Sequence, residues 1–385
     1  MCMTSEDKYP SRILFPFVGD TIGGSHLSAL ELINGLDRSL FEPVIAVHQD
    51  GMLVKYLKER EINYICLSRI SIKNQNKVNI LFFILKMAYF IRKNNIKIVH
   101  TNDGKMHPIW QSSAQIARIP YVRHQRTCFK VRNQNKQNKL NIGQLLPQTA
   151  KKIITISECC KNSLPPEMNH NSQIIMNPFN TKLSLPNRLE EREKLLNDLD
   201  CPLNYKIVGF VSNLIDYKRP QIFIEMASII CESGIDDIIF PMFGDKREPF
   251  VNLIEEEIKS RGLEKKCILM GPRFPIEPLM STFDVLVAPA VKEAFGRTIV
   301  ESMLVGTPVV AAEKGGHKEI IHHNDTGLLV EPDNPYAFAD SVINLLENPE
   351  LATKISESAR LWASKNCSVE KHVEAVQEIY LELIK

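Results

Sequence analysis

Two glutamates, Glu293 and Glu301, stand eight positions apart in the otherwise apolar segment "APAVKEAFGRTIVESM". The run "DVLVAPA" around Val287 predicts a buried strand, and the next helix is predicted to begin near Gly296 or Arg297. Glu293 would then lie in the loop at the carboxyl end of the strand, with Glu301 about one turn further along. Carboxylates accept hydrogen bonds from sugar hydroxyls, and the N–H groups of a helix start bind anionic oxygens. The spacing suits a ligand with a central phosphate and a hydroxylated ring at each end. A helix-start glutamate beside a surface glutamate is the alternative.

Two further loops after predicted strands carry residues that suit phosphate binding. In "VSNLIDYKRP", Lys218 supplies a cation a few residues after the apolar run "YKIVGFV". In "GDTIGGSHLSAL", Gly23 and Gly24 lack a Cβ, so the backbone can approach a phosphate or sugar at the start of the following helix. A solvated loop lysine and a plain glycine turn are the alternatives.

Histidines end two predicted strands in the first half of the chain, His100 in "IVHTND" and His124 in "YVRHQRT". A single histidine at such a position is more often structural than catalytic. Arg123 and Arg126 flank His124, and both could meet a phosphate on an acceptor substrate.

Strands alternate with helices along the whole chain, and the strand runs are apolar rather than alternating, which is typical of a parallel sheet covered on both faces. The pattern is interrupted near residues 178–190, where prolines and a charged helix predict a linker, and then begins again. We therefore expect an α/β protein with two Rossmann-like, doubly wound domains, at residues 1–180 and 190–365, with a cleft between them. Residues 366–385 form an amphipathic helix that we expect to pack back on the first domain.

Charge is distributed unevenly along the 385 residues, whose net charge is +2. Residues 1–180 carry 24 Lys and Arg against 12 Asp and Glu, whereas residues 181–385 carry 23 against 33. A basic half predicts an anionic partner: a membrane surface, a phosphorylated substrate or nucleic acid. A solvated basic face without a partner is the alternative.

The segment from Glu293 to Asn334 resembles the glutamate-x7-glutamate region of the family 4 glycosyltransferases, which have the GT-B architecture. The accompanying residues follow in the order of that family: Phe295, Gly296, Gly306, Pro308, Gly315, Gly316, Glu319, Thr326, Gly327 and Leu328. The resemblance covers most of the chain and is strongest from about residue 205 to 345. It implies a retaining, metal-independent transfer of a sugar from a nucleotide-sugar donor, with UDP favoured over GDP.

By this resemblance, Glu293, His124 and Lys218 are the catalytic residues. Glu293 contacts hydroxyls of the transferred sugar, His124 touches that sugar near the reaction centre, and Lys218 holds the diphosphate. Asn102 and Asp103 face the acceptor. The residues expected to bind the donor are Gly23, Gly24, Asn213, Lys218, Arg273, Ala294, Phe295, Gly296, Arg297 and Glu301, with Glu301 on the ribose and Arg273 near the base.

Asn213 departs from the pattern of the family, which usually has arginine there. An amide does not supply the charge of a guanidinium. Either Arg219 or another cation compensates, or the diphosphate is held more weakly.

The expected function is retaining transfer to a hydroxyl of a glycan, lipid-linked or phosphorylated acceptor, in bacterial surface-polysaccharide or lipopolysaccharide synthesis. We expect a cytoplasmic enzyme, peripheral on the inner face of the membrane through contact with anionic lipid, without a metal site or a nucleic-acid partner. The alternatives are another GT-B enzyme, either a phosphorylase or a nucleotide-sugar epimerase, and a non-catalytic nucleotide-sugar-binding protein.

Overall fold

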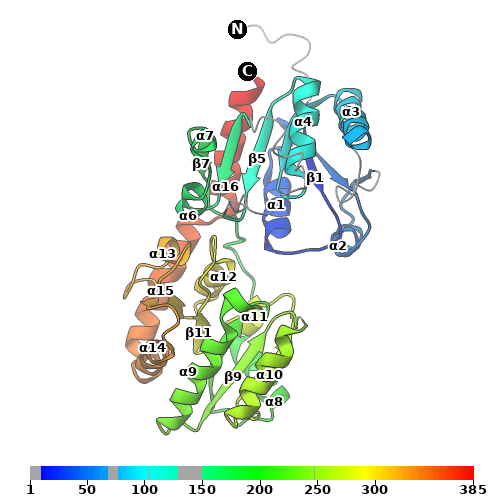
Figure 1. The fold of residues 1–385 in the computed structure, drawn as a ribbon. Helices are drawn as coiled ribbons and strands as arrows, with labels where there is room; N and C mark the ends of the chain where they lie inside the picture. Colours follow the sequence, from blue (N-terminus) through cyan, green and yellow to red (C-terminus); the bar gives the residue numbers. More distant parts are fainter. Residues whose placement is uncertain (1–9, 68–76, 103, 129–149, 247) are drawn as a thin grey trace. The chain divides into compact units, whose positions relative to one another are not determined.

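The chain folds into two compact units, which Figure 1 shows in a computed structural model that describes residues 10–67, 77–102, 104–128, 150–246 and 248–385. Unit 1 comprises Met1–Phe179 and Val369–Lys385, and unit 2 comprises Asn180–Ser368. Asp103, which the sequence analysis assigns to the acceptor, lies outside the described residues. Each unit is built on one parallel sheet with helices on both faces, which confirms the predicted pair of doubly wound α/β domains.

The sheet of unit 1 consists of parallel strands with mostly buried, apolar residues. Its strands are β1 (Ser11–Phe17), β2 (Phe41–Val47), β3 (Ile65–Cys66), β4 (Ile96–Thr101), β5 (Tyr121–Gln125), β6 (Lys152–Thr155) and β7 (Ser172–Ile174). They lie in the order β3-β2-β1-β4-β5-β6-β7. The chain leaves β1 toward one edge and later returns at β4 toward the other, so the topological switch point lies between these two strands.

Helices cover both faces of this sheet. They are α1 (Gly24–Gly35), α2 (Met52–Glu59), α3 (Lys77–Lys93), α4 (His107–Ala117), α6 (Glu158–Asn162), α7 (Pro166–Asn169) and the C-terminal α16 (Val369–Ile384). Helix α16 packs beside α1. Its residues Val373, Val376, Ile379 and Tyr380 belong to the same buried cluster as Ile13 of β1. The C-terminal helix therefore completes this hydrophobic core of unit 1.

The sheet of unit 2 repeats this topology. Its strands are β8 (Lys206–Val211), β9 (Ile238–Phe243), β10 (Cys267–Gly271), β11 (Val285–Ala288), β12 (Val309–Ala312) and β13 (Leu328–Val330). They lie in the order β10-β9-β8-β11-β12-β13. The switch point is therefore between β8 and β11, and the loops that follow these two strands are the expected place for a ligand.

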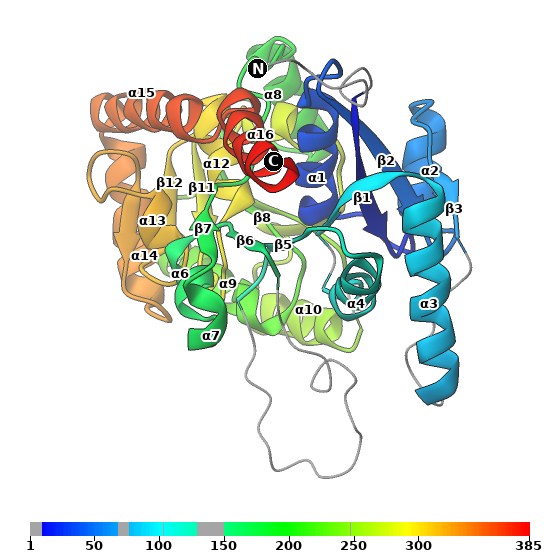
Figure 2. The ribbon, with the colours of Figure 1, turned by 90° about the horizontal axis from the view of Figure 1, so that it is seen from above.

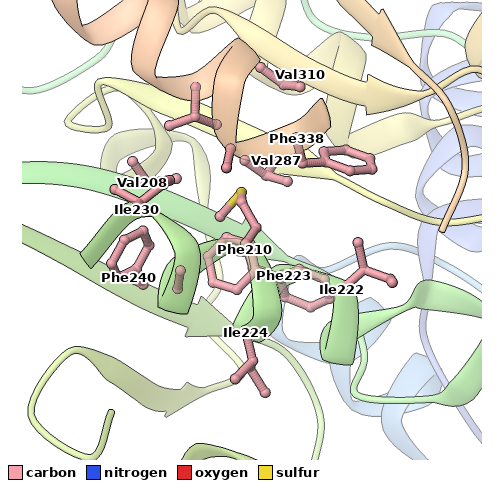
Figure 3. Close-up of a cluster of buried hydrophobic side chains, with 14 of the residues drawn as sticks. Val208, Phe210, Ile222, Phe223, Ile224, Ile230, Phe240, Val287, Val310 and Phe338 are labelled. Atoms are coloured by element: carbon pink, nitrogen blue, oxygen red, sulfur yellow. The ribbon is translucent and has the colours of Figure 1, made fainter. Parts of the chain in front are cut away.

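Figure 3 shows one cluster of buried hydrophobic side chains in unit 2. Phe210, Phe223, Phe240 and Phe338 pack with Val287 and are at most 1% exposed. The helices of this unit are α8 (Arg188–Asp198), the 3-10 helix η2 (Asp216–Lys218), α9 (Pro220–Glu232), α10 (Phe250–Ser260), α11 (Glu277–Met280), α12 (Arg297–Val305), α13 (His317–Ile320), α14 (Pro335–Glu347) and α15 (Pro349–Asn366).

Candidate active site

The switch point of unit 2 brings Lys218 and Glu293 together. Lys218 ends η2 in the loop after β8, and Glu293 lies in the loop after β11. The Lys218 ammonium donates a hydrogen bond to the Glu293 carboxylate, and the two side chains are only 20% and 22% exposed. The loops are also joined through the backbone, because Val291 N–H donates to the Tyr217 carbonyl at 3.1 Å. Two residues 75 positions apart thus form one partly buried ion pair.

Glycines on a neighbouring loop hold Glu293 in place. The N–H of Gly316 donates to the Glu293 carbonyl at 2.9 Å. A Cβ on Gly315, whose φ is +57°, would come within 2.5 Å of that carbonyl oxygen, and one on Gly316 would come within 2.7 Å of the Phe295 backbone. A larger residue at Gly315 or Gly316 would displace the loop that carries Glu293. These two glycines therefore allow Glu293 to take its position.

The start of α12 lies directly after Glu293. Gly296 precedes the helix with φ +112° and, as a glycine, has no side chain with which to cap it. Glu301 accepts a hydrogen bond of 3.0 Å from Arg297 one turn earlier. Burial raises the pKa of Glu301, while the Arg297 guanidinium opposes that rise. Arg297 and Glu301, both predicted to bind the donor, therefore pair with each other beside the Lys218–Glu293 pair, where the helix start suits an anion.

The other predicted donor residues lie around this cluster but take different roles. The Asn213 side-chain oxygen accepts from Asp245 N–H at 3.3 Å and so joins the loops after β8 and β9. Arg219, which could replace the missing arginine, is engaged by Asp333 at 2.7 Å and Asp216 at 3.0 Å. Arg273 is exposed after β10 and contacts the Pro272 carbonyl at 3.2 Å. Of these cations and polar groups, only Lys218 contacts Glu293, and the expected contacts of Asn213 and Arg273 with a donor stay predictions.

Unit 1 contains a cavity of about 260 Å³ at the carboxyl ends of β1, β4 and β5. Arg126 donates to the Asn102 side-chain oxygen at 2.9 and 3.0 Å, while the buried Nδ2 of Asn102 has no hydrogen-bond partner among the described residues. Lys105, Arg123 and Arg126 make the lining basic. The lining residues are Asp20, Thr21, Ser25, His26, Asn102, Gly104, Lys105, His107, Arg123, Gln125, Arg126 and Thr127.

The predicted glycines border this cavity without lining it. Gly23 precedes α1 with extended backbone, and Gly24 is the first residue of the helix. A Cβ on Gly23 would meet nothing within 4 Å. The space in front of this helix start is therefore open, and the contact of either glycine with a donor stays a prediction.

His124 lies inside a histidine cluster, which we define as His100, His124 and His372 with Tyr380 and Arg126. His100 Nε2 and His124 Nδ1 are 3.2 Å apart, and the rings of His124 and His372 stack with centroids 5.6 Å apart. His100 also hydrogen-bonds to the Tyr380 hydroxyl. Arg126 can only donate, so its 3.3 Å contact with His124 Nδ1 leaves the proton of His124 on Nε2, which has no hydrogen-bond partner among the described residues. His124 is 0% exposed, and its contact with a donor sugar stays a prediction.

Residues 191–362 match the protein family described as glycosyl transferases group 1. This segment, which makes up less than half of the chain, is similar to the group 1 glycosyltransferases. The match confirms the family resemblance over these residues, which contain Lys218, Glu293 and Glu301, and it supports the enzyme class predicted from the sequence.

Relatives of this chain differ in how much of it they cover. The D-inositol 3-phosphate glycosyltransferase of Corynebacterium glutamicum is 29% identical over 46% of this chain, and the match spans only 44% of that relative. The chain thus spans about half the length of the first curated relatives it matches. A relative from Escherichia coli, the UDP-Gal:alpha-D-GlcNAc-diphosphoundecaprenol alpha-1,3-galactosyltransferase, is 22% identical over 94% of this chain and 97% of its own.

Solved structures share the fold of this chain over nearly its whole length. The Anabaena protein HepE, crystallised in complex with UDP, aligns with a TM-score of 0.83 over 97% of this chain and 100% of its own, at 22% identity. A glycosyltransferase from Rickettsia africae aligns with a TM-score of 0.81 over 98% and 99%, at 26% identity. The predicted GT-B fold class is therefore confirmed.

Sequence reasoning missed several residues that the structure brings to these sites. Lys105 and Thr127 line the unit 1 cavity, and His372 and Tyr380 complete the histidine cluster from α16. Lys105 and Thr127 could have been identified from the sequence, since both follow predicted strands within a few positions. For His372 the sequence gives no signal except its place on the buried stripe of an amphipathic helix, because only the fold brings α16 beside β5.

The folded protein is expected to lose stability as the pH falls below about 6.5, the ordinary pKa of histidine. Burial, followed by repulsion from Arg126, lowers the pKa of His372 to about 3 and those of His100 and His124 well below the usual value. The unfolded chain binds protons on these rings near pH 6.5 and the folded chain does not. Their contribution is therefore complete above pH 6.5 and is lost as the pH falls toward the folded values.

Between pH 7.5 and 5, each of these rings should lower the free energy of unfolding by roughly 2 kcal/mol. Urea unfolding of the wild type and of His372→Gln at both pH values measures this. The variant should lose about 2 kcal/mol less than the wild type over the same interval. An identical loss in both proteins would contradict the assignment of a neutral buried ring to His372.

Proposed function

We propose that the protein transfers a sugar from a nucleotide diphosphate sugar to a hydroxyl of an acceptor, with retention of the anomeric configuration. The observation that carries the proposal is the Lys218–Glu293 ion pair near the start of α12, at the switch point of unit 2. A cation, a carboxylate and a helix start within one ligand-sized region match the diphosphate and the hydroxylated ring of such a donor.

The ion pair of the ligand-free protein would open when the donor binds. Its diphosphate takes the Lys218 ammonium and the amide groups at the start of α12, and the Glu293 carboxylate turns to hydroxyls of the sugar. Glu301 is expected to bind the ribose in exchange for part of its contact with Arg297. The name of the Escherichia coli relative contains a UDP-sugar, and HepE was crystallised with UDP and with UDP-glucose, which supports UDP over GDP as the nucleotide.

The reaction breaks the bond between the anomeric carbon and the diphosphate oxygen. The acceptor oxygen bonds to that carbon on the same face, and its proton passes to the departing phosphate, so the products are the glycosylated acceptor and the nucleoside diphosphate. Lys218 stabilises the negative charge that develops on the leaving group. Glu293 orients the sugar, and we assign it no acid or base step because it pairs with a lysine on the donor side. Activity that persists in EDTA would support the proposed independence from metal.

The acceptor is proposed to carry a phosphate or diphosphate group that binds in the unit 1 cavity. Lys105, Arg123 and Arg126 provide positive charge there, and Nδ2 of Asn102, which has no partner within the described part of the chain, provides a donor. The Escherichia coli relative is named for a diphosphoundecaprenol acceptor, which is such a lipid-linked substrate. A role in surface-polysaccharide or lipopolysaccharide synthesis, on the cytoplasmic side of the membrane, follows as part of the proposal.

Replacement of Arg123 by glutamine should raise the KM for a diphospholipid acceptor by roughly 10- to 100-fold, since a hydrogen bond to a charged group contributes about 1.5–3 kcal/mol. The KM for the nucleotide sugar and the melting temperature should stay unchanged. Lys151→Gln removes one positive charge from an exposed position of unit 1 and serves as the control. An unchanged acceptor KM in Arg123→Gln would contradict the proposal that the acceptor phosphate binds in this cavity.

Product analysis separates this function from its alternatives. With UDP-glucose, UDP-galactose or UDP-N-acetylglucosamine and a diphospholipid acceptor, the proposal predicts free UDP and an α-linked product in equal amounts. A sugar 1-phosphate would indicate a phosphorylase, and an altered but intact nucleotide sugar would indicate an epimerase. Binding of UDP without any turnover across the donors would favour a non-catalytic nucleotide-sugar-binding protein.

A further inference from the structure

We infer that the exposed side of α3 docks on the surface of an anionic lipid bilayer, with the helix lying along that surface. Figure 2 shows α3 at the margin of unit 1, beside α4. The helix has 17 residues, which corresponds to a length of about 26 Å. The inference goes beyond the proposed reaction and holds or fails independently of it.

One face of α3 is apolar although it is exposed. These side chains recur at intervals of three and four positions and are between 48% and 71% exposed. Such spacing places them on a single stripe of the helix. We call this stripe the α3 apolar face, and its members are Val78, Leu81, Phe82, Leu85 and Tyr89.

A second apolar stripe of the same helix already forms the contact with unit 1. Ile80, Ile84, Met87, Ala88 and Ile91 are at most 5% exposed and belong to the buried cluster that includes Trp110 of α4. The core therefore needs only one side of α3. The α3 apolar face is not needed for the hydrophobic core of unit 1, and exposed apolar patches of this kind mark interaction surfaces.

Positive charge borders the α3 apolar face. Lys86, Arg92 and Lys93 are exposed on the same helix, and the Lys93 ammonium lies 6.0 Å from the centre of the Tyr89 ring. The sequence holds no Asp or Glu between Glu61 and Asp103. A basic rim around apolar and aromatic side chains is the pattern of a helix that lies in the headgroup region of a membrane, where each Lys or Arg contributes about 1 kcal/mol on anionic lipid.

A lipid surface fits this rim better than a second copy of the chain. Two α3 apolar faces in contact would bring the basic side chains of both copies close together, and like charges repel. Anionic headgroups instead complement the rim. None of the helices in the described part of the chain is both long and apolar enough to cross a membrane, so the contact we infer lies along the surface.

Vesicle flotation tests this docking with the full chain. Vesicles of phosphatidylcholine with roughly 30% phosphatidylglycerol should carry the protein at low salt, and vesicles of phosphatidylcholine alone should carry far less. The double variant Phe82→Glu/Leu85→Glu should bind the anionic vesicles about tenfold more weakly or worse. Leu253→Glu/Leu361→Glu changes two similarly exposed leucines in unit 2 and should bind like the wild type.

Two further measurements keep the outcome unambiguous. Both double variants should keep the wild-type melting temperature and the wild-type turnover of a soluble acceptor, which separates this inference from the proposed function. Absence of wild-type binding to anionic vesicles at low salt, or equal binding by Phe82→Glu/Leu85→Glu, would overturn the inference. Sedimentation velocity supplies the last check, since a wild-type dimer that this variant dissociates would assign the α3 apolar face to a second copy instead.

Discussion

Glu293→Ala should lower kcat for sugar transfer at least about a hundredfold, because a carboxylate that holds the reacting sugar acts mainly in the transition state. The carboxylate pairs with Lys218 in the ligand-free protein, and Gly316 fixes its backbone. The variant leaves the ammonium partly buried without this partner, so a small loss of stability is expected as well. Kinetic assays with the donor at saturation, beside thermal unfolding, separate the two effects.

Glu191→Ala provides a matched control for this variant. Glu191 accepts from Lys194 at 2.7 Å in α8, which is also in unit 2. The control thus removes a glutamate from a lysine pair that lies outside the candidate site. Transfer near the wild-type rate in Glu293→Ala, with the fold intact, would contradict the assignment of Glu293.

Lys218→Ala should lower kcat by a similar factor, about 100- to 1000-fold, and should also weaken binding of the nucleoside diphosphate. Removal of the ammonium takes away a charge that opposes the growing negative charge on the leaving group. The effect should be large because Asn213 supplies no charge and Arg219 is engaged by Asp333 and Asp216. Steady-state kinetics and UDP titration measure the two losses.

Lys194→Ala is the control for this second variant, since it removes a lysine from the exposed pair in α8. It should keep wild-type kcat and UDP affinity. If Lys218→Ala also kept them, another group would have to hold the diphosphate, and the role proposed for Lys218 would be wrong.

Much of the fold could be predicted from the sequence because parallel strands buried on both faces appear as continuous apolar runs. The runs that contain Val99, Val208 and Val287 were all assigned to strands, and each lies in a sheet. The short strand β7 was missed. Its three residues, Ser172–Ile174, are partly exposed and include serine and glutamine, so they carry neither an apolar run nor a long alternating pattern.

The candidate site could be predicted only residue by residue. Glu293, Glu301 and Lys218 were found because each follows a strand or opens a helix in a recognisable segment. Their pairing could not be found, because the contact between Lys218 and Glu293 depends on the close approach of two loops, which Gly315 and Gly316 support.

Two other features depend on burial rather than on residue type. The run "VNILFFILKMAYFI" in α3 is apolar almost throughout, and a sequence does not show which of its two apolar stripes faces the core. In the same way, the family resemblance implied a catalytic role for His124, whereas its stacking on His372 and its complete burial appear only when α16 is in place.

Calorimetric titration of UDP and GDP in EDTA, with the wild type, Lys218→Ala and Lys194→Ala, tests the central claim most directly. That claim is that the Lys218–Glu293 site holds the nucleotide of a sugar donor. The account predicts UDP binding by the wild type and by Lys194→Ala, and an affinity about 10-fold or more lower for Lys218→Ala, since one charge-assisted hydrogen bond contributes about 1.5–3 kcal/mol. The contrary result would be wild-type protein that binds neither nucleotide, or Lys218→Ala that binds UDP as tightly as the wild type.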